Sequence, residues 1–92
     1  MRKPIKQGIS TFFALMAEYN TSEIPLENIS EKFFGLGPEK SKSMASKHKL
    51  PIPAHRCGSQ KSKWLINAVD LASFIDKKRE DARIEWERVN NY

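Results

Sequence analysis

The sequence has a single cysteine, Cys57, and no apolar run near the ~18 residues that a membrane-spanning helix needs. One thiol cannot form an internal disulfide, which fits a reducing compartment such as the cytoplasm. The basic N-terminal stretch MRKPIKQGISTFFALMAEYN lacks both a clean apolar run and a small-residue cleavage site. We therefore expect this stretch to fold as a helix rather than act as a signal peptide, and we expect a cytoplasmic protein.

Acidic residues are almost absent from the middle of the chain. Between Pro38 and Lys63 the only acid is Glu39, against seven cations, namely Lys40, Lys42, Lys47, Lys49, Arg56, Lys61 and Lys63. This segment carries a net charge of +6, whereas nine cations and ten acids give the rest of the chain −1. Charge confined to one segment points to a polyanionic partner, because solubility alone requires no such concentration.

The remaining composition is that of an ordinary globular domain, with 39% hydrophobic and 29% charged residues and no internal repeat. Ninety-two residues are near the lower limit of what a single core can stabilise. We therefore expect residues 1–92 to form one domain.

Apolar residues recur at helical spacing near both ends of the chain. Phe12, Leu15, Met16 and Tyr19 predict a helix over about residues 10–20, capped by Ser10 or Thr11. Asn67 is the predicted cap of a longer helix over about residues 68–89. Its apolar stripe consists of Leu71, Phe74, Ile75, Ala82, Trp86 and Val89. Because the helix is longer than this domain needs, the end of the stripe is expected to pack on the first helix or on a second copy of the chain.

Between these helices, the sequence predicts an extended segment at IPL, a helix from about Glu27 to Phe34, and a helix from about Pro38 to His48. Pro25 disfavours helical angles at Ile24, and the glycines of GLGP separate the two helices. The second helix is expected to turn Ser41, Met44, Ala45 and His48 toward the core. Its outward face then carries Glu39, Lys42, Ser43 and Ser46, flanked by Lys47 and Lys49.

The next segment predicts a β-hairpin from Ile52 to Ile66, with its tip at about residues 58–62. LPIPAHRC is typical of an edge strand, because prolines cannot donate to a ladder, and KWLI is typical of the returning strand. The predicted fold is therefore mainly α with a small β-hairpin. Its element order is that of a winged helix-turn-helix over about residues 24–79.

A winged helix-turn-helix suits DNA, because a helix fits the major groove and short polar side chains allow it to approach base edges. The outward face of the basic helix is expected to enter the groove, and the wing to contact phosphates. The predicted DNA-binding residues are Lys40, Lys42, Ser43, Ser46, Lys47, Lys49, Arg56, Gln60, Lys61 and Lys63.

Five motifs occur in an order and spacing that resembles the pyocin activator family of phage and prophage regulators. They are TFFALMAEY, IPLENISEKFFGLGPEK, LPIP, SQKS and VDLASFID, within about Phe12 to Arg79. The middle of the chain also resembles excisionase- and MerR-type winged helices. The family resemblance implies a small DNA-binding transcriptional activator of prophage-derived genes, without enzymatic activity or cofactor. Such a protein is expected to be associated with the nucleoid in the cytoplasm. One departure is that SKSMASKHK contains no arginine, so this helix cannot form the arginine-to-guanine contact that most often gives base specificity.

Other interpretations of the same residues remain. His48, His55 and Cys57 offer too few ligands at suitable spacing for a metal or thiol site, so none is expected. Trp64 is expected to lie in the core between the wing and the last helix. Two further functions would use the same surface: an excisionase-like recombination directionality factor, and an antirepressor-type adaptor that binds an acidic protein. The expected partners are double-stranded DNA and a second copy of the chain, with RNA polymerase as a further candidate and no membrane.

Overall fold

The structure is a computed structural model that describes the backbone of residues 5–91 and the side chains of residues 11–91. It is mainly helical, with four α-helices, one π-helical segment and a two-stranded antiparallel sheet in this range. In chain order the elements are α1 (Ile5–Tyr19), β1 (Glu23–Pro25), α2 (Leu26–Ile29), η1 (Ser30–Phe34), α3 (Pro38–Ser46), β2 (Leu65–Asn67) and α4 (Ala68–Asn90).

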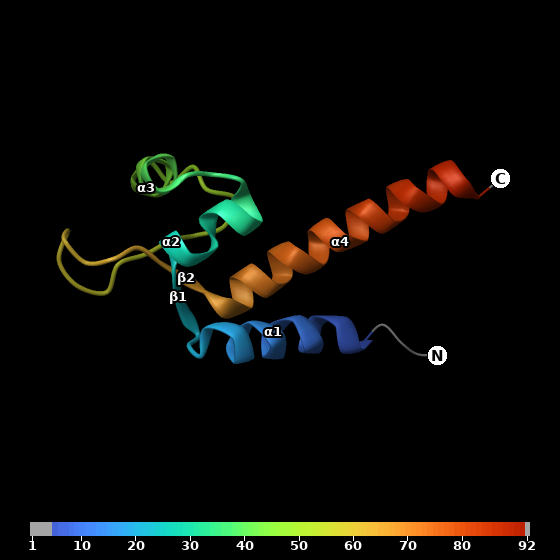
Figure 1. The fold of residues 1–92 in the computed structure, drawn as a ribbon, viewed down its shortest axis with the longest axis horizontal. Coiled ribbons are helices and arrows are strands. Elements are labelled where there is room, and N and C mark those ends of the chain that lie inside the picture. Colours follow the sequence, from blue (N-terminus) through green and yellow to red (C-terminus); the bar gives the residue numbers. More distant parts are fainter. Residues whose placement is uncertain (1–4, 92) are drawn as a thin grey trace.

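Helices α1 and α4 run antiparallel and pack against each other (Figure 1). The predicted stripe of α1 is confirmed, since Leu15 is buried and Phe12, Met16 and Tyr19 pack against the core. The predicted start of α1 is wrong, because the helix already begins at Ile5 and runs through Ser10 and Thr11. Thr11 is not a cap: it is buried, and its hydroxyl hydrogen-bonds Asp76 and Arg79 of α4.

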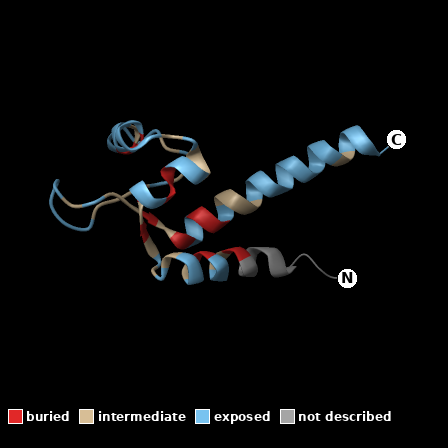
Figure 2. Ribbon diagram, in the orientation of Figure 1, coloured by how far each residue is buried: buried red, intermediate tan, exposed pale blue. Residues whose placement is uncertain are grey.

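The core lies where the sheet meets the starts of α2 and α4 (Figure 2). Ile24 of β1 pairs with Ile66 of β2, and both side chains are completely buried. Leu26, Ile29 and Leu71 complete this centre. The predicted cap of α4 is confirmed, because the Asn67 side chain accepts hydrogen bonds from the backbone N–H groups of Val69 and Asp70 at 2.8 and 3.4 Å.

The sheet is not the hairpin that the sequence predicted. β2 pairs with β1, and the segment before it joins the sheet only through the isolated bridge between His55 and Leu65. The predicted edge strand does not form, because Pro51 and Pro53 have no N–H groups to donate to a ladder. A turn does occur at the predicted tip, where Ser62 N donates to Ser59 O at 3.0 Å. Residues 55–64 are called the basic loop below.

Helix α3 also ends earlier than predicted. His48 was expected on its packed face, but α3 ends at Ser46 and His48 is exposed with φ 57°. His48 N donates to Ala45 O, and Lys49 N donates to Met44 O, at 3.1 and 2.8 Å. These two bonds form the Schellman motif, which ends a helix with a left-handed residue and turns the chain away from its axis.

The two preceding segments differ from the sequence prediction in detail. The helix expected from about Glu27 to Phe34 begins at Leu26 and becomes π-helical at Ser30. The glycines of GLGP separate the two helices as expected: Gly35 is left-handed with φ 69°, whereas Gly37 is extended and precedes the first turn of α3. These breaks turn α3 back against α2 and η1.

The molecule is elongated, with principal extents of 53 × 25 × 17 Å. Its radius of gyration is 15.2 Å, whereas a compact chain of this length has about 12 Å. The distal half of α4 accounts for the difference, because it projects beyond the core and is almost entirely exposed (Figures 1 and 2). α3 and the basic loop lie toward the opposite end (Figure 1). No helix in the described range is long and apolar enough to cross a membrane.

Candidate nucleic-acid interface

Helix α3 buries its small side chains and exposes its lysines. Ser41 and Ala45 are 0% and 2% exposed and let the helix lie close to α2 and η1, as the sequence predicted. The opposite face is open to solvent, with Lys42, Ser43 and Ser46 all exposed. A face of short polar groups and flexible cations can therefore approach another surface closely.

The two outward serines of α3 differ in their hydrogen bonding. The Ser46 hydroxyl donates to the backbone carbonyl of Ser43 at 2.9 Å, within the helix. Its oxygen lone pairs stay available, so in this rotamer Ser46 is an acceptor toward any ligand. The side chain of Ser43 can both donate and accept. An outward-facing pair of this kind can meet base edges that carry either donors or acceptors.

Arg56 is held in place within the basic loop. Its guanidinium lies over the Trp64 ring, 4.1 Å from the centroid, and its Nη1 donates to the carbonyl oxygen of Gln60. Trp64 is half-buried and packs against the core, so its ring provides a fixed surface on which Arg56 lies. The expectation of a core position for Trp64 is thus met in part, because one face of the ring is covered by Arg56.

The base of the basic loop is attached to the sheet by polar contacts. His55 Nε2 lies 3.0 Å from Glu23 Oε1, which is an ion-pair distance without hydrogen-bond alignment. Asn67 Nδ2 donates to the other Glu23 oxygen at 3.0 Å. His55 thus faces a carboxylate, and Cys57 is exposed. Within the described residues, no three His, Cys, Asp or Glu side chains lie together as a metal site would require.

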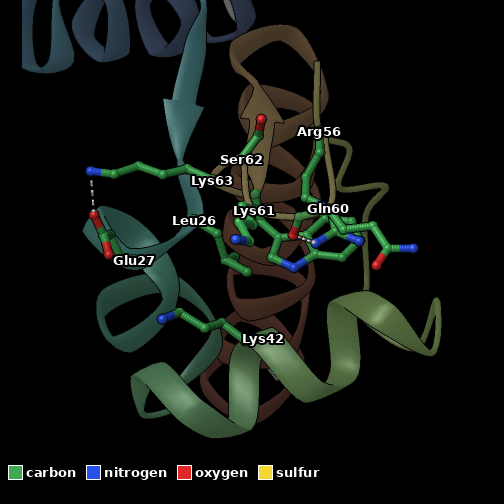
Figure 3. Close-up of a pocket in the computed structure, with 9 residues that line it drawn as sticks. Leu26, Glu27, Lys42, Arg56, Gln60, Lys61, Ser62 and Lys63 are labelled. Atoms are coloured by element: carbon green, nitrogen blue, oxygen red, sulfur yellow. Dashed lines mark hydrogen bonds and ion pairs between the residues drawn. The ribbon is translucent and has the colours of Figure 1, made fainter. Parts of the chain in front are cut away.

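A groove of about 310 Å³ separates α3 from the basic loop (Figure 3). It brings together five of the predicted DNA-binding residues from two elements far apart in sequence: Lys42, Arg56, Gln60, Lys61 and Lys63. Leu26 and Trp64 provide apolar lining. The other five, namely Lys40, Ser43, Ser46, Lys47 and Lys49, are exposed but do not line the groove.

The cations of this region differ from those of α4 in their partners. Of the seven cations between residues 38 and 63, only Lys63 pairs with a carboxylate in the described structure. In α4, by contrast, four of the five cations pair with acids of the same helix: Lys77, Arg79, Arg83 and Arg88. The charge on α4 is thus compensated internally, whereas most of the central charge is available to an external anion.

Glu27 is the site residue that sequence reasoning missed. Its carboxylate accepts a hydrogen bond from Lys63 Nζ at 2.9 Å, 36 positions away along the chain. This hydrogen bond and the charge of Lys63 lower the pKa of Glu27 below its ordinary value of 4.5, and the charge of Lys42 adds to the effect. No sequence pattern marks this pair, because only the pairing of β1 with β2 brings the two residues together.

The fold and the charge distribution define a small helical protein with one strongly basic, acid-poor end. A comparison with protein-family models matches residues 11–82 to the family described as pyocin activator protein PrtN. Because this match covers most of the chain, the protein belongs to that family, which is a family of phage-related transcriptional activators rather than of enzymes. Comparisons with curated proteins and with solved structures give no match. The resemblance predicted from the sequence motifs is confirmed.

Proposed function

We propose that the protein activates transcription by binding double-stranded DNA through α3 and the basic loop. The observation that carries this proposal is the cluster of cations around an exposed helix and its adjoining groove, most of which have no carboxylate partner in the described structure. Such a surface attracts a polyanion, and neutralising phosphates releases condensed counterions from DNA. The family supports the activator role, since its members are regulators named for activating pyocins.

In the proposed complex, α3 lies in the major groove. Its nine residues extend over roughly 14 Å, which suits a groove about 12 Å wide. Ser43 and Ser46 are too short to reach far, so α3 must sit deep, with Lys42 and Lys47 beside the bases. The basic loop then meets the backbone with Arg56, Lys61 and Lys63. This is a winged helix-turn-helix arrangement in which a loop replaces the usual ladder.

We also infer that a second copy of the chain pairs with the distal half of α4. Trp86 and Val89 are 63% and 52% exposed there, and with the exposed Ala82 they form a stripe at spacings of four and three residues. That spacing is typical of a helix–helix contact. Arg83 pairs with Glu80 and Glu87, and Arg88 pairs with Glu85. Most charges beside the stripe are thus paired within α4, so a strongly acidic or basic partner gains little over an identical helix.

The size of this stripe predicts when the copies pair. Its exposed apolar side chains present a few hundred Å² at most. Stable complexes bury about 800 Å² per partner, so pairing in solution is expected to be weak. DNA would supply the remaining stabilisation by holding two copies on adjacent half-sites. Dimers are therefore expected mainly on DNA.

The test is a selection of genomic fragments by the purified full-length chain, followed by sequencing. We expect one enriched motif, and binding that falls steeply with salt because phosphate contacts dominate. The selected fragment is then placed upstream of a reporter, where the protein should raise expression. Binding that is unaffected by salt, or lost to an acidic protein competitor, would instead indicate an adaptor. Site-specific excision without reporter activation would indicate a recombination factor.

A further inference from the structure

The groove between α3 and the basic loop is lined by several cations and one acid. Four cations line it, namely Lys42, Arg56, Lys61 and Lys63, and Glu27 is the only acid among the lining residues. A carboxylate in this position repels phosphate and lowers the charge that a polyanion meets.

The backbone places Glu27 beside Lys63. Leu26 N donates to Trp64 O at 2.9 Å, and this bond connects the start of α2 to the end of the basic loop. Glu27 and Lys63 are the chain neighbours of the two bonded residues. Their side chains therefore start side by side, and the 2.9 Å contact between them follows from the fold of the main chain.

The pair is accessible to an incoming anion. The side chains of Lys63 and Glu27 are 69% and 43% exposed. In Figure 3 the Glu27 carboxylate lies between the ammonium groups of Lys63 and Lys42, and both charges act on it. A phosphate that approaches Lys63 must either bind beside the Glu27 carboxylate or displace it from Lys63. An exposed ion pair is weak enough for such an exchange.

We propose that Glu27 competes with DNA phosphate for Lys63 and thereby sets the DNA affinity of the protein. This inference rests on the proposed function, since it takes the groove to be part of the DNA-binding surface. In the free protein, Glu27 holds Lys63 and reduces the effective charge of the groove. On binding, Lys63 transfers to a phosphate, while Glu27 remains as a repulsive group.

The experiment is a double-mutant cycle with Glu27→Gln, Lys63→Ala and the two combined, in the full-length chain. Affinities are measured on a selected target duplex and a scrambled duplex at several salt concentrations. Glu27→Gln should bind both duplexes about two- to fivefold more tightly at low salt, the size of one exposed ion pair. Its log–log salt slope should change by less than the ~0.9 of one phosphate, because Lys63 contacts a phosphate in both complexes. In the Lys63→Ala background, the gain from Glu27→Gln should fall to less than about half.

Glu31→Gln is the matched control, because Glu31 is an exposed acid of neighbouring η1 that does not line the groove. It should change affinity by much less than Glu27→Gln. Two results overturn the proposal. An equal gain with and without Lys63 would mean that Glu27 acts through its charge in general and not through Lys63. A loss of affinity in Glu27→Gln would mean that Glu27 positions Lys63 for DNA binding. Failure of the unsubstituted protein to bind any duplex would reject the proposed function itself, so the two failures are distinguishable.

Discussion

The guanidinium of Arg56 lies over the indole of Trp64, with its central carbon 4.1 Å from the ring centroid. A planar cation on an aromatic face loses little freedom when it binds, because the contact already fixes its orientation. The further bond from Arg56 to the Gln60 carbonyl orients the guanidinium within the loop. Arg56 is thus the cation of the basic loop whose orientation is fixed by the most contacts in the described structure.

This geometry predicts that charge alone cannot replace Arg56. Lysine keeps the charge but cannot stack as a plane or donate in two directions from one rigid group. Arg56→Lys should therefore lose more than half of the binding free energy that Arg56→Ala loses, measured on the target duplex at fixed salt. Lys61→Arg is the control, because Lys61 has no ring beneath it in the described structure, and it should bind like the unsubstituted protein. Wild-type affinity in Arg56→Lys would contradict the prediction.

Substitutions at the serines of α3 are predicted to have two different effects, loss of target preference at exposed positions and unfolding at the buried one. Ser43 and Ser46 are exposed, so Ser43→Glu or Ser46→Glu should leave the fold intact but set a carboxylate against the DNA. Target preference over scrambled duplex should then disappear. Ser41→Glu is the contrasting variant, because Ser41 is fully buried and an ionised side chain there should unfold the domain. Circular dichroism distinguishes the two, and retained target preference in both exposed variants would mean that another face contacts the bases.

Lys61 is predicted to contact phosphate without contributing to sequence choice. It lies at the exposed end of the basic loop and lines the groove without an ion-pair partner in the described structure. Lys61→Ala should weaken binding to target and scrambled duplex by similar factors. The log–log salt slope should become shallower by ~0.9, the contribution of one phosphate. A loss confined to the target duplex would assign Lys61 a base contact instead.

The local signals in the sequence were sufficient for most helices. The α1 stripe and the Asn67 cap depend on spacing and on one side chain, and both were predicted correctly. The prediction of a hairpin was wrong, because the partner of a strand is not determined by the strand's own residues. Leu65–Asn67 can pair with β1 as well as with the segment just before it, and its sequence does not indicate which of the two it pairs with. His48 was misplaced for a related reason, since the Schellman turn depends on a left-handed residue that is usually glycine or asparagine.

The candidate site was predicted as a set of residues but not as an arrangement. Charge counting identified the cations, and helical periodicity identified the outward face of α3. The groove and the Glu27–Lys63 pair could not be predicted, because each joins segments that only the tertiary fold brings together. The stacking of Arg56 on Trp64 lies within the basic loop, but it depends on how that loop bends. Contacts of this kind leave no periodic trace in one sequence.

A buried hydroxyl, that of Thr11, links α1 to α4. Thr11 Oγ1 donates to Asp76 Oδ1 at 2.7 Å and accepts from Arg79 Nη1 at 2.8 Å. Thr11→Val keeps the shape but removes the hydroxyl from both partners, so it should lower the free energy of unfolding by about 1–3 kcal/mol. Denaturant unfolding measures this loss, with the exposed Ser73→Ala as the control. An unchanged unfolding midpoint in Thr11→Val would show that the cluster contributes nothing to stability.

Trp86 is predicted to control assembly on DNA. Trp86→Ala should abolish the binding of a second copy to the target, because it removes the largest side chain of the stripe without changing α3 or the basic loop. Ile84→Ala is a close control, because Ile84 is 51% exposed on the same helix. It lies two positions before Trp86 and therefore faces nearly the opposite side of the helix. Analytical ultracentrifugation with target duplex should show two copies bound for the unsubstituted chain and for Ile84→Ala, and one for Trp86→Ala. The affinity of the first copy should be equal in all three. If Trp86→Ala still loads two copies with unchanged cooperativity, the second copy does not use the distal half of α4.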